Sequence, residues 1–261
     1  MTTTPYENDR DAIRPPWAAA KGWLKKRLSR SWNLTVVGAA PITPRMRRVS
    51  LIGEDLAELD WVPGQDLVLE LPVGGGEVAQ RYYTIRRFDP AELRLDMDFV
   101  LHGHGASARW LEALRPGDRI DALGPRGRTR LAGDVESHLF LGDETCIPAI
   151  FAMAETVPRG ASATALIEVE DETDMQPLDT PANVTVEWHY RRGAAPADSS
   201  LVLDRLQALS PDPYSTHAYV IGETSQVRSL RHDLLARGFD KARITAEGYW
   251  RPGRIGGHDH V

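Results

Sequence analysis

A short run of charged, aromatic and hydroxyl residues, Arg81-Tyr82-Tyr83-Thr84-Ile85-Arg86, offers the side chains that a flat, phosphorylated ligand needs. Side chains alternate between the two faces of an extended strand, so Arg81 and Tyr83 would share one face. A guanidinium pairs with phosphate, and an aromatic ring packs against a planar ring system. Thr84 would present its hydroxyl and backbone at the edge of that ring. Taken alone, the run is more typical of an ordinary strand with a surface arginine and a core tyrosine.

A second run, residues 98–107, passes from a strand into glycines and then into the start of a helix. Glycines let the backbone approach a ligand closely, and a helix N-terminus presents free N–H groups to an anion. Ser107 adds a hydroxyl in that first turn, although a simple N-cap and tight turn would use the same residues. His102 and His104 have no third ligand beside them, so we expect no metal site here.

The third run, Leu141-Gly142-Asp143-Glu144-Thr145-Cys146-Ile147-Pro148, follows a buried strand. Ligands of open α/β sheets bind at the carboxyl ends of strands, so this position predicts a cofactor site. Asp143 and Glu144 would repel a phosphate on the same helix start, which leaves Thr145 and the backbone as the expected binding groups. The run is neither a GxGxxG fingerprint nor a Walker loop.

Two further positions have competing interpretations. Arg191 and Arg192 follow a strand that ends at Tyr190, where dinucleotide folds place an arginine for the 2′-phosphate of NADP. A solvated pair of charges in a loop explains them equally well. Cys146 is more typical of a small buried residue than of a nucleophile, because no activating partner can be assigned around it.

Composition excludes several classes of protein. The 261 residues include 31 Lys and Arg against 37 Asp and Glu, a net charge of −6, which disfavours binding to nucleic acid. The single cysteine excludes an internal disulfide, a CxxC pair and a four-cysteine cluster, and fits a reducing cytoplasm. No apolar run reaches the length of a membrane span, and the N-terminus has no signal-peptide core.

The elements that position these runs fall into two groups. In the first group, six short apolar or alternating runs separated by prolines and glycines predict antiparallel strands, with one helix at 106–115. Such a pattern is typical of a small antiparallel β-barrel. The strand candidates are residues 33–39, 46–52, 66–73, 81–88, 92–102 and 118–124.

In the second group, strands alternate with helices, which predicts a doubly wound parallel α/β sheet. The strand candidates are 138–143, 163–170, 183–190, 217–223 and 242–250, and the helix candidates are 147–157, 200–209 and 224–238. We therefore divide the chain into an extension at 1–31, a barrel domain at 32–131, an α/β domain at 132–251 and a flexible tail at 252–261.

The extension contains a Trp-rich segment, residues 17–32, with apolar residues at helical spacing and five Lys and Arg without an acid. It fits a helix that packs on its own protein with a solvated basic face. It also fits a helix that binds a membrane surface or a partner protein.

Taken in order, the motifs of residues 32–251 resemble those of the siderophore-interacting protein family. These are FAD-dependent ferric-siderophore reductases, distantly related to ferredoxin–NADP reductase. The motifs that carry the resemblance are TPRMRRVSL, PGQ, RYYTIRR, DFVLHGHGASARW, PGDRIDALGPRG, GDETCIP, IGETSQVRSLR and GYWRPG.

The resemblance implies a role for each motif. The barrel of six strands would bind FAD, with Tyr83 against the isoalloxazine and Thr84 near its N5 as the catalytic pair. The other FAD contacts would be Arg81, Asp98, Phe99, Val100, His102, Gly105, Ala106, Ser107 and Trp250. NADPH or NADH would contact Gly142, Asp143, Glu144, Thr145, Arg191, Arg192, Glu223, Ser225 and Arg228. The ferric siderophore would meet Arg86, Arg87, Arg251 and Arg254, and the protein would bind no metal of its own.

The implied activity is electron transfer from NAD(P)H through flavin to chelated iron(III), in a cytoplasmic, monomeric enzyme. One alternative is a reductase of the same fold that uses or serves ferredoxin or flavodoxin. Another is a non-catalytic protein that binds flavin or siderophore.

Overall fold

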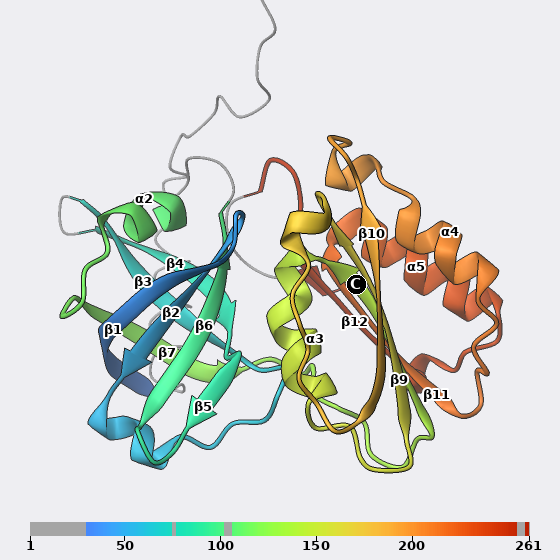
Figure 1. Cartoon of the computed structure of the whole chain (residues 1–261), viewed down its shortest axis with the longest axis horizontal. Helices are drawn as coiled ribbons and strands as arrows, with labels where there is room; N and C mark the ends of the chain where they lie inside the picture. The colour runs from blue at the N-terminus through green and yellow to red at the C-terminus, as the bar shows by residue number, and fades with distance from the viewer. Residues whose placement is uncertain (1–29, 75–76, 102–105, 255–258, 261) are drawn as a thin grey trace, which may run out of the picture.

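The structure, a computed structural model, describes residues 30–74, 77–101, 106–254 and 259–260 (Figure 1). An antiparallel sheet occupies the N-terminal half and a mostly parallel sheet with helices the C-terminal half. The predicted boundary near residue 131 lies in the segment between the two sheets. The helix predicted within residues 17–32 lies outside the described residues, except that Ser31 and Trp32 begin the first strand.

The N-terminal sheet has seven strands in the order β4-β3-β7-β1-β2-β6-β5. Its strands are β1 (Ser31–Thr43), β2 (Met46–Ile52), β3 (Asp66–Gly74), β4 (Glu77–Thr84), β5 (Arg87–Asp89), β6 (Arg94–Val100) and β7 (Arg119–Arg126). The short helices beside them are η1 (Glu54–Glu58) and α2 (Ala106–Ala113).

The predicted strand at 81–88 is divided in the structure, and this changes the strand count from six to seven. β4 and β5 lie at opposite ends of the strand order, yet only Ile85 and Arg86 separate them in the chain. The Ile85 amide donates to the carbonyl of Gln65 beside β3 (3.0 Å), and the Arg86 amide donates to Asp96 of β6 (3.0 Å). The sheet therefore curls until its two ends meet at this corner, as a small barrel requires.

The interior of this sheet explains why these residues form strands. Apolar side chains at alternate positions of β1 and β3 point into it and are at most 1% exposed: Leu34, Val36, Leu67 and Leu69. Phe99 of β6 completes the centre. Trp110, Leu111 and Leu114, on and just after α2, pack against this core beside the strands.

The C-terminal sheet has the order β10-β9-β8-β11-β12-β13, in which the first five strands are parallel and the last is antiparallel. The strands are β8 (Ser137–Asp143), β9 (Ser162–Val169), β10 (Asn183–Tyr190), β11 (Thr216–Glu223), β12 (Ile244–Trp250) and β13 (Asp259–His260). The helices are η2 (Glu144–Cys146), α3 (Ile147–Ala154), η3 (Glu172–Asp174), η4 (Pro196–Asp198), α4 (Leu201–Ala208), α5 (Thr224–Ala236) and η5 (Lys241–Arg243).

Helices cover both faces of this sheet, as predicted. Figure 1 shows α3 on the face toward the barrel and α4 with α5 on the opposite face. Two core clusters correspond to these faces, one around Phe151 of α3 and one around Leu206 of α4 and Leu234 of α5. The predicted flexible tail includes β13, whose residues Asp259 and His260 pair with Gly248 and Glu247.

The two halves share an interface of both apolar and ionic contacts. Met46 of β2 is buried in the cluster around α3. Arg86, predicted to contact the siderophore, is instead only 6% exposed and binds both carboxylate oxygens of Glu155 beyond α3, at 2.6 and 3.0 Å. Arg45 likewise pairs with Asp171 and Asp174, each at 2.8 Å.

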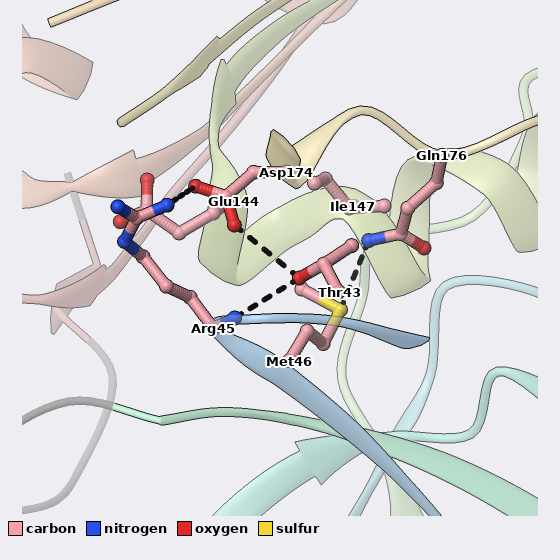
Figure 2. A pocket seen from close by; sticks show the side chains of 7 residues that line it. All are labelled: Thr43, Arg45, Met46, Glu144, Ile147, Asp174 and Gln176. Atoms are coloured by element: carbon pink, nitrogen blue, oxygen red, sulfur yellow. Dashed lines mark hydrogen bonds and ion pairs between the residues drawn. The ribbon is translucent and has the colours of Figure 1, made fainter. Parts of the chain in front are cut away.

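A small cavity lies at this interface (Figure 2). Asp174 and Gln176 reach across it from the α/β half toward Thr43 and Met46, and Arg45 and Glu144 complete its polar wall. Thr43 and Arg45 bond Asp174 across it, and Gln176 donates to the sulfur of Met46, so the cavity forms part of the domain contact.

Burial of His217 in β11 predicts a specific pH dependence of stability. Burial, with the nearby charges of His138 and Arg243, lowers the pKa of His217 to about 4 from 6.5, and its Nε2 lies 2.9 Å from the hydroxyl of Thr245. The unfolded chain binds a proton near pH 6.5 and the folded chain only near pH 4, so stability falls as the pH drops through this window.

Lowering of the His217 pKa from 6.5 to about 4 corresponds to ~3 kcal/mol at most. We expect His217→Gln to flatten the decline in the free energy of urea unfolding between pH 7 and pH 4.5, relative to the unsubstituted protein. An unchanged slope would contradict this assignment.

Candidate functional site

Tyr83 and Ser107, predicted from separate motifs, meet in the structure. Tyr83 lies on β4 with its ring centroid 4.0 Å from that of Phe99, at an interplanar angle of 41°. Burial raises the pKa of Tyr83, and a hydrogen bond with Ser107 at the start of α2 partly offsets this. A supported aromatic ring, a hydroxyl and a helix start therefore converge at one place.

Thr84 connects this place to the α/β half. Its side chain is 6% exposed and hydrogen-bonds Tyr249 near the end of β12. Burial raises the pKa of Tyr249 well above its ordinary value, and the carboxylates of Glu247 and Asp66 raise it further. Tyr249 therefore stays a neutral phenol. The contact joins the predicted flavin strand to β12, whose last residue, Trp250, is also a predicted FAD contact.

Other predicted FAD contacts have different surroundings. Phe99 is fully buried in the barrel core, where its ring supports Tyr83, so it has no surface left for a ligand. The Asp98 carboxylate is bound by Arg48 through two hydrogen bonds of 2.7 and 2.8 Å, which turns it away from a ligand role. Arg81 bonds the carbonyl of Gln80, and Val100 packs against the domain interface.

For three residues of the glycine-containing run at 98–107, the structure gives little information about FAD contacts. His102 and Gly105 lie outside the described residues, and Ala106 is described only as the first residue of α2. Their predicted contacts with FAD therefore remain predictions.

Arg81, Tyr83 and Ser107 together fit the flavin cofactor that the fold implies. Arg81 and Tyr83 lie two residues apart on β4 and so on one strand face, which places a cation near an aromatic platform. Ser107 stands in the first turn of α2, where backbone N–H groups are free for an anion. A planar ring with a diphosphate needs this combination of groups.

The loop after β8, predicted to bind nicotinamide, is organised by Asp143. Its carboxylate accepts hydrogen bonds from the Thr145 amide (2.8 Å), the Glu223 amide (2.8 Å) and the Trp250 indole (3.0 Å). Burial, and then the charge of Glu144, raise the pKa of Asp143 to about 6. The predicted residues Gly142 to Thr145, Glu223 and Trp250 are thus brought together by one side chain.

Glycines make this close packing possible. A Cβ atom on Gly142 would lie 2.2 Å from both Cys146 Sγ and the Ile221 carbonyl, and one on Gly222 would lie 2.6 Å from an Asp143 oxygen. Gly222 also has φ of +137°, a conformation that other residues rarely adopt. β8 and β11 can therefore approach closely only with glycine at both positions.

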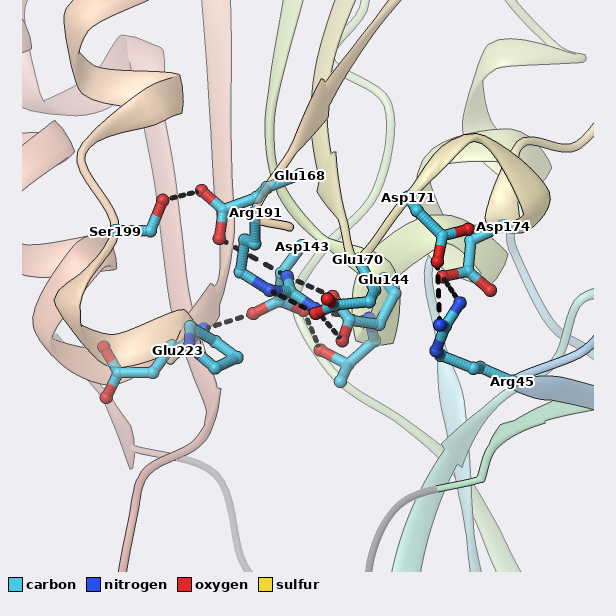
Figure 3. Close-up of polar contacts among 12 residues, drawn as sticks. Arg45, Asp143, Glu144, Glu168, Glu170, Asp171, Asp174, Arg191, Ser199 and Glu223 are labelled. Atoms are coloured by element: carbon cyan, nitrogen blue, oxygen red, sulfur yellow. Dashed lines mark hydrogen bonds and ion pairs between the residues drawn. The ribbon is translucent and has the colours of Figure 1, made fainter. Parts of the chain in front are cut away.

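Arg191 and Glu144 are engaged with each other. The Arg191 side chain is 3% exposed and binds Glu144 through two bonds of 2.7 Å (Figure 3). The Arg191 guanidinium also lies 3.3 Å from a carboxylate oxygen of Glu168 and 3.8 Å from one of Glu170. Burial alone would lower the pKa of Arg191, but the hydrogen bonds and negative charges of Glu144 and Glu168 together outweigh it, and the pKa is raised. An arginine enclosed by three carboxylates cannot serve a 2′-phosphate, which corrects that assignment for Arg191.

Arg192, its neighbour, has the opposite environment. Its side chain is 63% exposed, pairs with Glu172, and lies with its guanidinium carbon 5.4 Å from the ring centre of Tyr190. Since exposed ion pairs contribute little stability, Arg192 can exchange its partner for a phosphate. The assignment to a 2′-phosphate therefore rests on Arg192 alone.

Glu223 and Ser225 form a helix cap. The Glu223 carboxylate accepts hydrogen bonds from the amides of Ser225 (2.7 Å) and Gln226 (3.0 Å) and also from the Ser225 hydroxyl, at the start of α5. Asp143 and Glu223, at the ends of β8 and β11, therefore both cap backbone N–H groups. Arg228, one turn along α5, is exposed.

The remaining predicted cations are Arg87, Arg251 and Arg254, all of which are exposed. Sequence reasoning missed Arg126, Arg128 and Arg130, which flank Thr129. Thr129 is 1% exposed and donates a 2.7 Å hydrogen bond to Glu247 of β12, so this arginine run lies beside the domain junction. The sequence signal that could have identified them is the motif PRGRTR, in which every second residue is an arginine.

Cys146 is buried, as predicted. Its thiol donates to the carbonyl of Asp143 (2.8 Å), and burial raises its pKa well above the ordinary value. A protonated, enclosed thiol is not a nucleophile. Across the described part of the chain, no group of three or more potential ligands could hold a metal ion. None of the described helices is long and apolar enough to cross a membrane.

Comparison with known proteins agrees with this arrangement. Residues 135–253 match the family model described as siderophore-interacting protein, and residues 68–129 match the model of the siderophore-interacting FAD-binding domain. The crystal structure of a siderophore utilization protein from T. fusca is 34% identical and superposes with a TM-score of 0.79, over 87% of this chain and 95% of that one. The chain belongs to the siderophore-interacting protein family.

Two relatives of known sequence extend the comparison. Ferric vibriobactin reductase ViuB of Vibrio cholerae is 29% identical over 238 residues, 82% of this chain and 86% of that protein. An uncharacterized protein of Mycobacterium tuberculosis is 34% identical over 188 residues, which span 67% of this chain and 65% of the relative.

Proposed function

We propose that this chain is an FAD-dependent ferric-siderophore reductase that takes electrons from NADPH or NADH. The observation that carries the proposal is the contact between Thr84 of the flavin strand and Tyr249 of the α/β half. This contact supports the proposal because it joins the strand of Tyr83 to the end of β12, at the edge of the sheet where ligands of open α/β folds bind. The similarity to ferric vibriobactin reductase supports the choice of substrate.

The residues of this chain have distinct tasks in this proposal. Tyr83 packs against the isoalloxazine, while Arg81 and the start of α2 hold the phosphates. Thr84, which is buried and bonded to Tyr249, shields the flavin edge from water. Bound FAD would accept a hydride from the nicotinamide and pass single electrons to iron(III). The exposed arginines, Arg128, Arg130, Arg251 and Arg254, would attract an anionic ferric chelate.

The siderophore supplies its own iron in this proposal. Iron(II) binds hard oxygen donors more weakly than iron(III), so reduction would release the metal without protein ligands. We propose that the protein acts as a monomer in the reducing cytoplasm. If the basic N-terminal segment binds a membrane, the full-length protein should associate with lipid vesicles. This association should be lost when residues 1–29 are removed.

The test is an anaerobic titration of the purified protein. We expect a flavin spectrum that NADPH or NADH bleaches, and that recovers when a ferric catecholate or hydroxamate is added, with iron(II) appearing in a ferrous trap. A flavin that neither nicotinamide bleaches would contradict the proposed donor and favour ferredoxin or a binding role. A colourless protein that cannot be reconstituted with FAD would contradict the proposal as a whole.

Arg192 predicts how the chain distinguishes the two nicotinamides. Arg192→Ala should raise the KM for NADPH by roughly tenfold, the loss expected for one charge-assisted phosphate contact of ~1.5 kcal/mol. The KM for NADH should change less than twofold, because NADH lacks the 2′-phosphate. Steady-state kinetics with both nucleotides measure this difference, and equal changes for the two would remove the assignment.

A further inference from the structure

The carboxylate of Asp143 joins three elements that are far apart in the sequence. Oδ1 accepts from the Thr145 amide in η2, while Oδ2 accepts from the Glu223 amide before α5 and from the Trp250 indole at the end of β12. The residue is 3% exposed, and Figure 3 shows its side chain directed toward the Glu223 backbone. One buried side chain therefore holds both helix starts and the last parallel strand together.

Asp143 lies where this fold otherwise takes a ligand anion. In the order β10-β9-β8-β11-β12, the chain reverses its direction of growth between β8 and β11, and ligands of open α/β sheets bind in the crevice at such a point. Here the Thr145 and Glu223 amides at that crevice already bind Asp143. Gly222 leaves room for it, since a Cβ there would lie 2.6 Å from Oδ2.

The indole bond extends this connection to the barrel. Trp250 follows Tyr249, whose hydroxyl is bonded to Thr84 on the barrel side of the junction. The Trp250 carbonyl is also fixed by the hydroxyl of Thr224 (2.9 Å). Tyr249 and Trp250 are adjacent on β12, so these two residues link Asp143, through the indole, to Thr84 of the barrel.

We propose that Asp143 is a positioning residue, which fixes Trp250 and through it the Tyr249–Thr84 contact between the nicotinamide and flavin sides of the site. The link from Asp143 to Trp250 stands on the hydrogen bonds alone. Its consequence for hydride transfer rests on the proposed function.

Ionisation of Asp143 makes the link testable. The pKa of Asp143 is raised to about 6, so the carboxylate gains a proton within an accessible pH range and becomes a weaker acceptor for the indole. The titratable groups around it are Glu144 and Cys146 on its own loop, Glu223 at the end of β11 and Tyr249 on β12. Glu144 is paired with Arg191, the Glu223 carboxylate caps α5, and burial raises the pKa of Cys146 and Tyr249 well above their ordinary values, so we expect the indole to respond to protonation of Asp143.

The direct test is the indole ¹H–¹⁵N resonance of Trp250 in the full-length protein, identified by its loss in Trp250→Phe. We expect this resonance to titrate with a midpoint near 6 and to lose that titration in Asp143→Asn. Trp188→Phe, the same change at a ring that packs on Phe151 in the same half, should leave the titration intact. A Trp250 resonance that does not titrate, or that titrates unchanged in Asp143→Asn, would overturn the proposal.

A second measurement is the single-turnover rate at which the nicotinamide reduces bound flavin. Small misplacements of reacting groups are costly, so we expect Asp143→Asn and Trp250→Phe each to lower this rate about tenfold. The double variant should be no slower than the slower single variant, because both remove one link. If the rate of the double variant falls by the product of the two single effects, the proposal is overturned. If neither nicotinamide reduces the unsubstituted protein while the indole still titrates, the proposed function fails and the link stands.

Discussion

Arg191→Met is expected to lower the free energy of unfolding by about 3–5 kcal/mol, the cost of removing one partner from a buried ion pair. The Arg191 side chain is 3% exposed, and the substitution leaves Glu168, which is fully buried, beside Glu144 without its counter-charge. Methionine matches the length of the arginine stem but cannot donate hydrogen bonds. Urea unfolding at pH 7.5, followed by circular dichroism, measures the loss.

Arg192→Met is the matched control, because it makes the same change at the next residue. Arg192 is 63% exposed and pairs only with Glu172 and the Tyr190 ring, so its loss should cost within about 0.5 kcal/mol. The deficit of Arg191→Met should also shrink toward pH 5, since burial already raises the pKa of Glu168 and a protonated Glu168 needs no cation. Equal losses for the two variants would show that Arg191 is not enclosed as described.

Tyr83→Ala is expected to weaken FAD binding by roughly 30- to 100-fold. Burial of a large aromatic ring and its stacking together contribute roughly 2–3 kcal/mol, and each 1.4 kcal/mol is about tenfold in Kd. Tyr83 rests on Phe99 at 4.0 Å, so alanine leaves a gap that a flavin ring cannot fill. Titration of the flavin-free protein with FAD, followed by flavin fluorescence and the visible spectrum, gives the Kd.

Two variants separate stacking from general damage. Tyr82→Ala removes the neighbouring ring, which lies on the other strand face with the guanidinium carbon of Arg126 5.4 Å from its centre, and should change the Kd less than threefold. Tyr83→Phe keeps the ring and loses only the bond to Ser107, so we expect less than a tenfold change. Unchanged FAD affinity and spectrum in Tyr83→Ala would refute the stacking role.

Local sequence patterns were sufficient for most of the fold. Alternation of apolar residues in β1 and β3, with proline and glycine between runs, identified the barrel strands, and the switch to helical spacing after residue 143 identified the α/β half. Such patterns depend on neighbours a few residues apart. The division of residues 81–88 into β4 and β5 escaped prediction because it depends on where the curled sheet closes.

Side-chain roles were predicted where a single motif sufficed and missed where the partner is distant. Residue type and position singled out Tyr83, Ser107 and the loop at Asp143, whose contacts with a cofactor stay predictions. Arg86, Arg191 and Asp98 were assigned to ligands, yet their partners Glu155, Glu144 and Arg48 stand 69, 47 and 50 residues away. Charged residues look alike in a sequence whether they face a ligand or a carboxylate across an interface.

Residue order by itself thus determined the two-domain class, most of the strand and helix positions and the motifs that place this chain in its family. Only the tertiary structure decided which arginines are enclosed and which are exposed, and that Asp143 holds Trp250. The physical reason is the distance along the chain between the residues that interact. Secondary structure follows from periodicity within a segment, whereas the partner of a charge is set by folding of segments that the sequence separates.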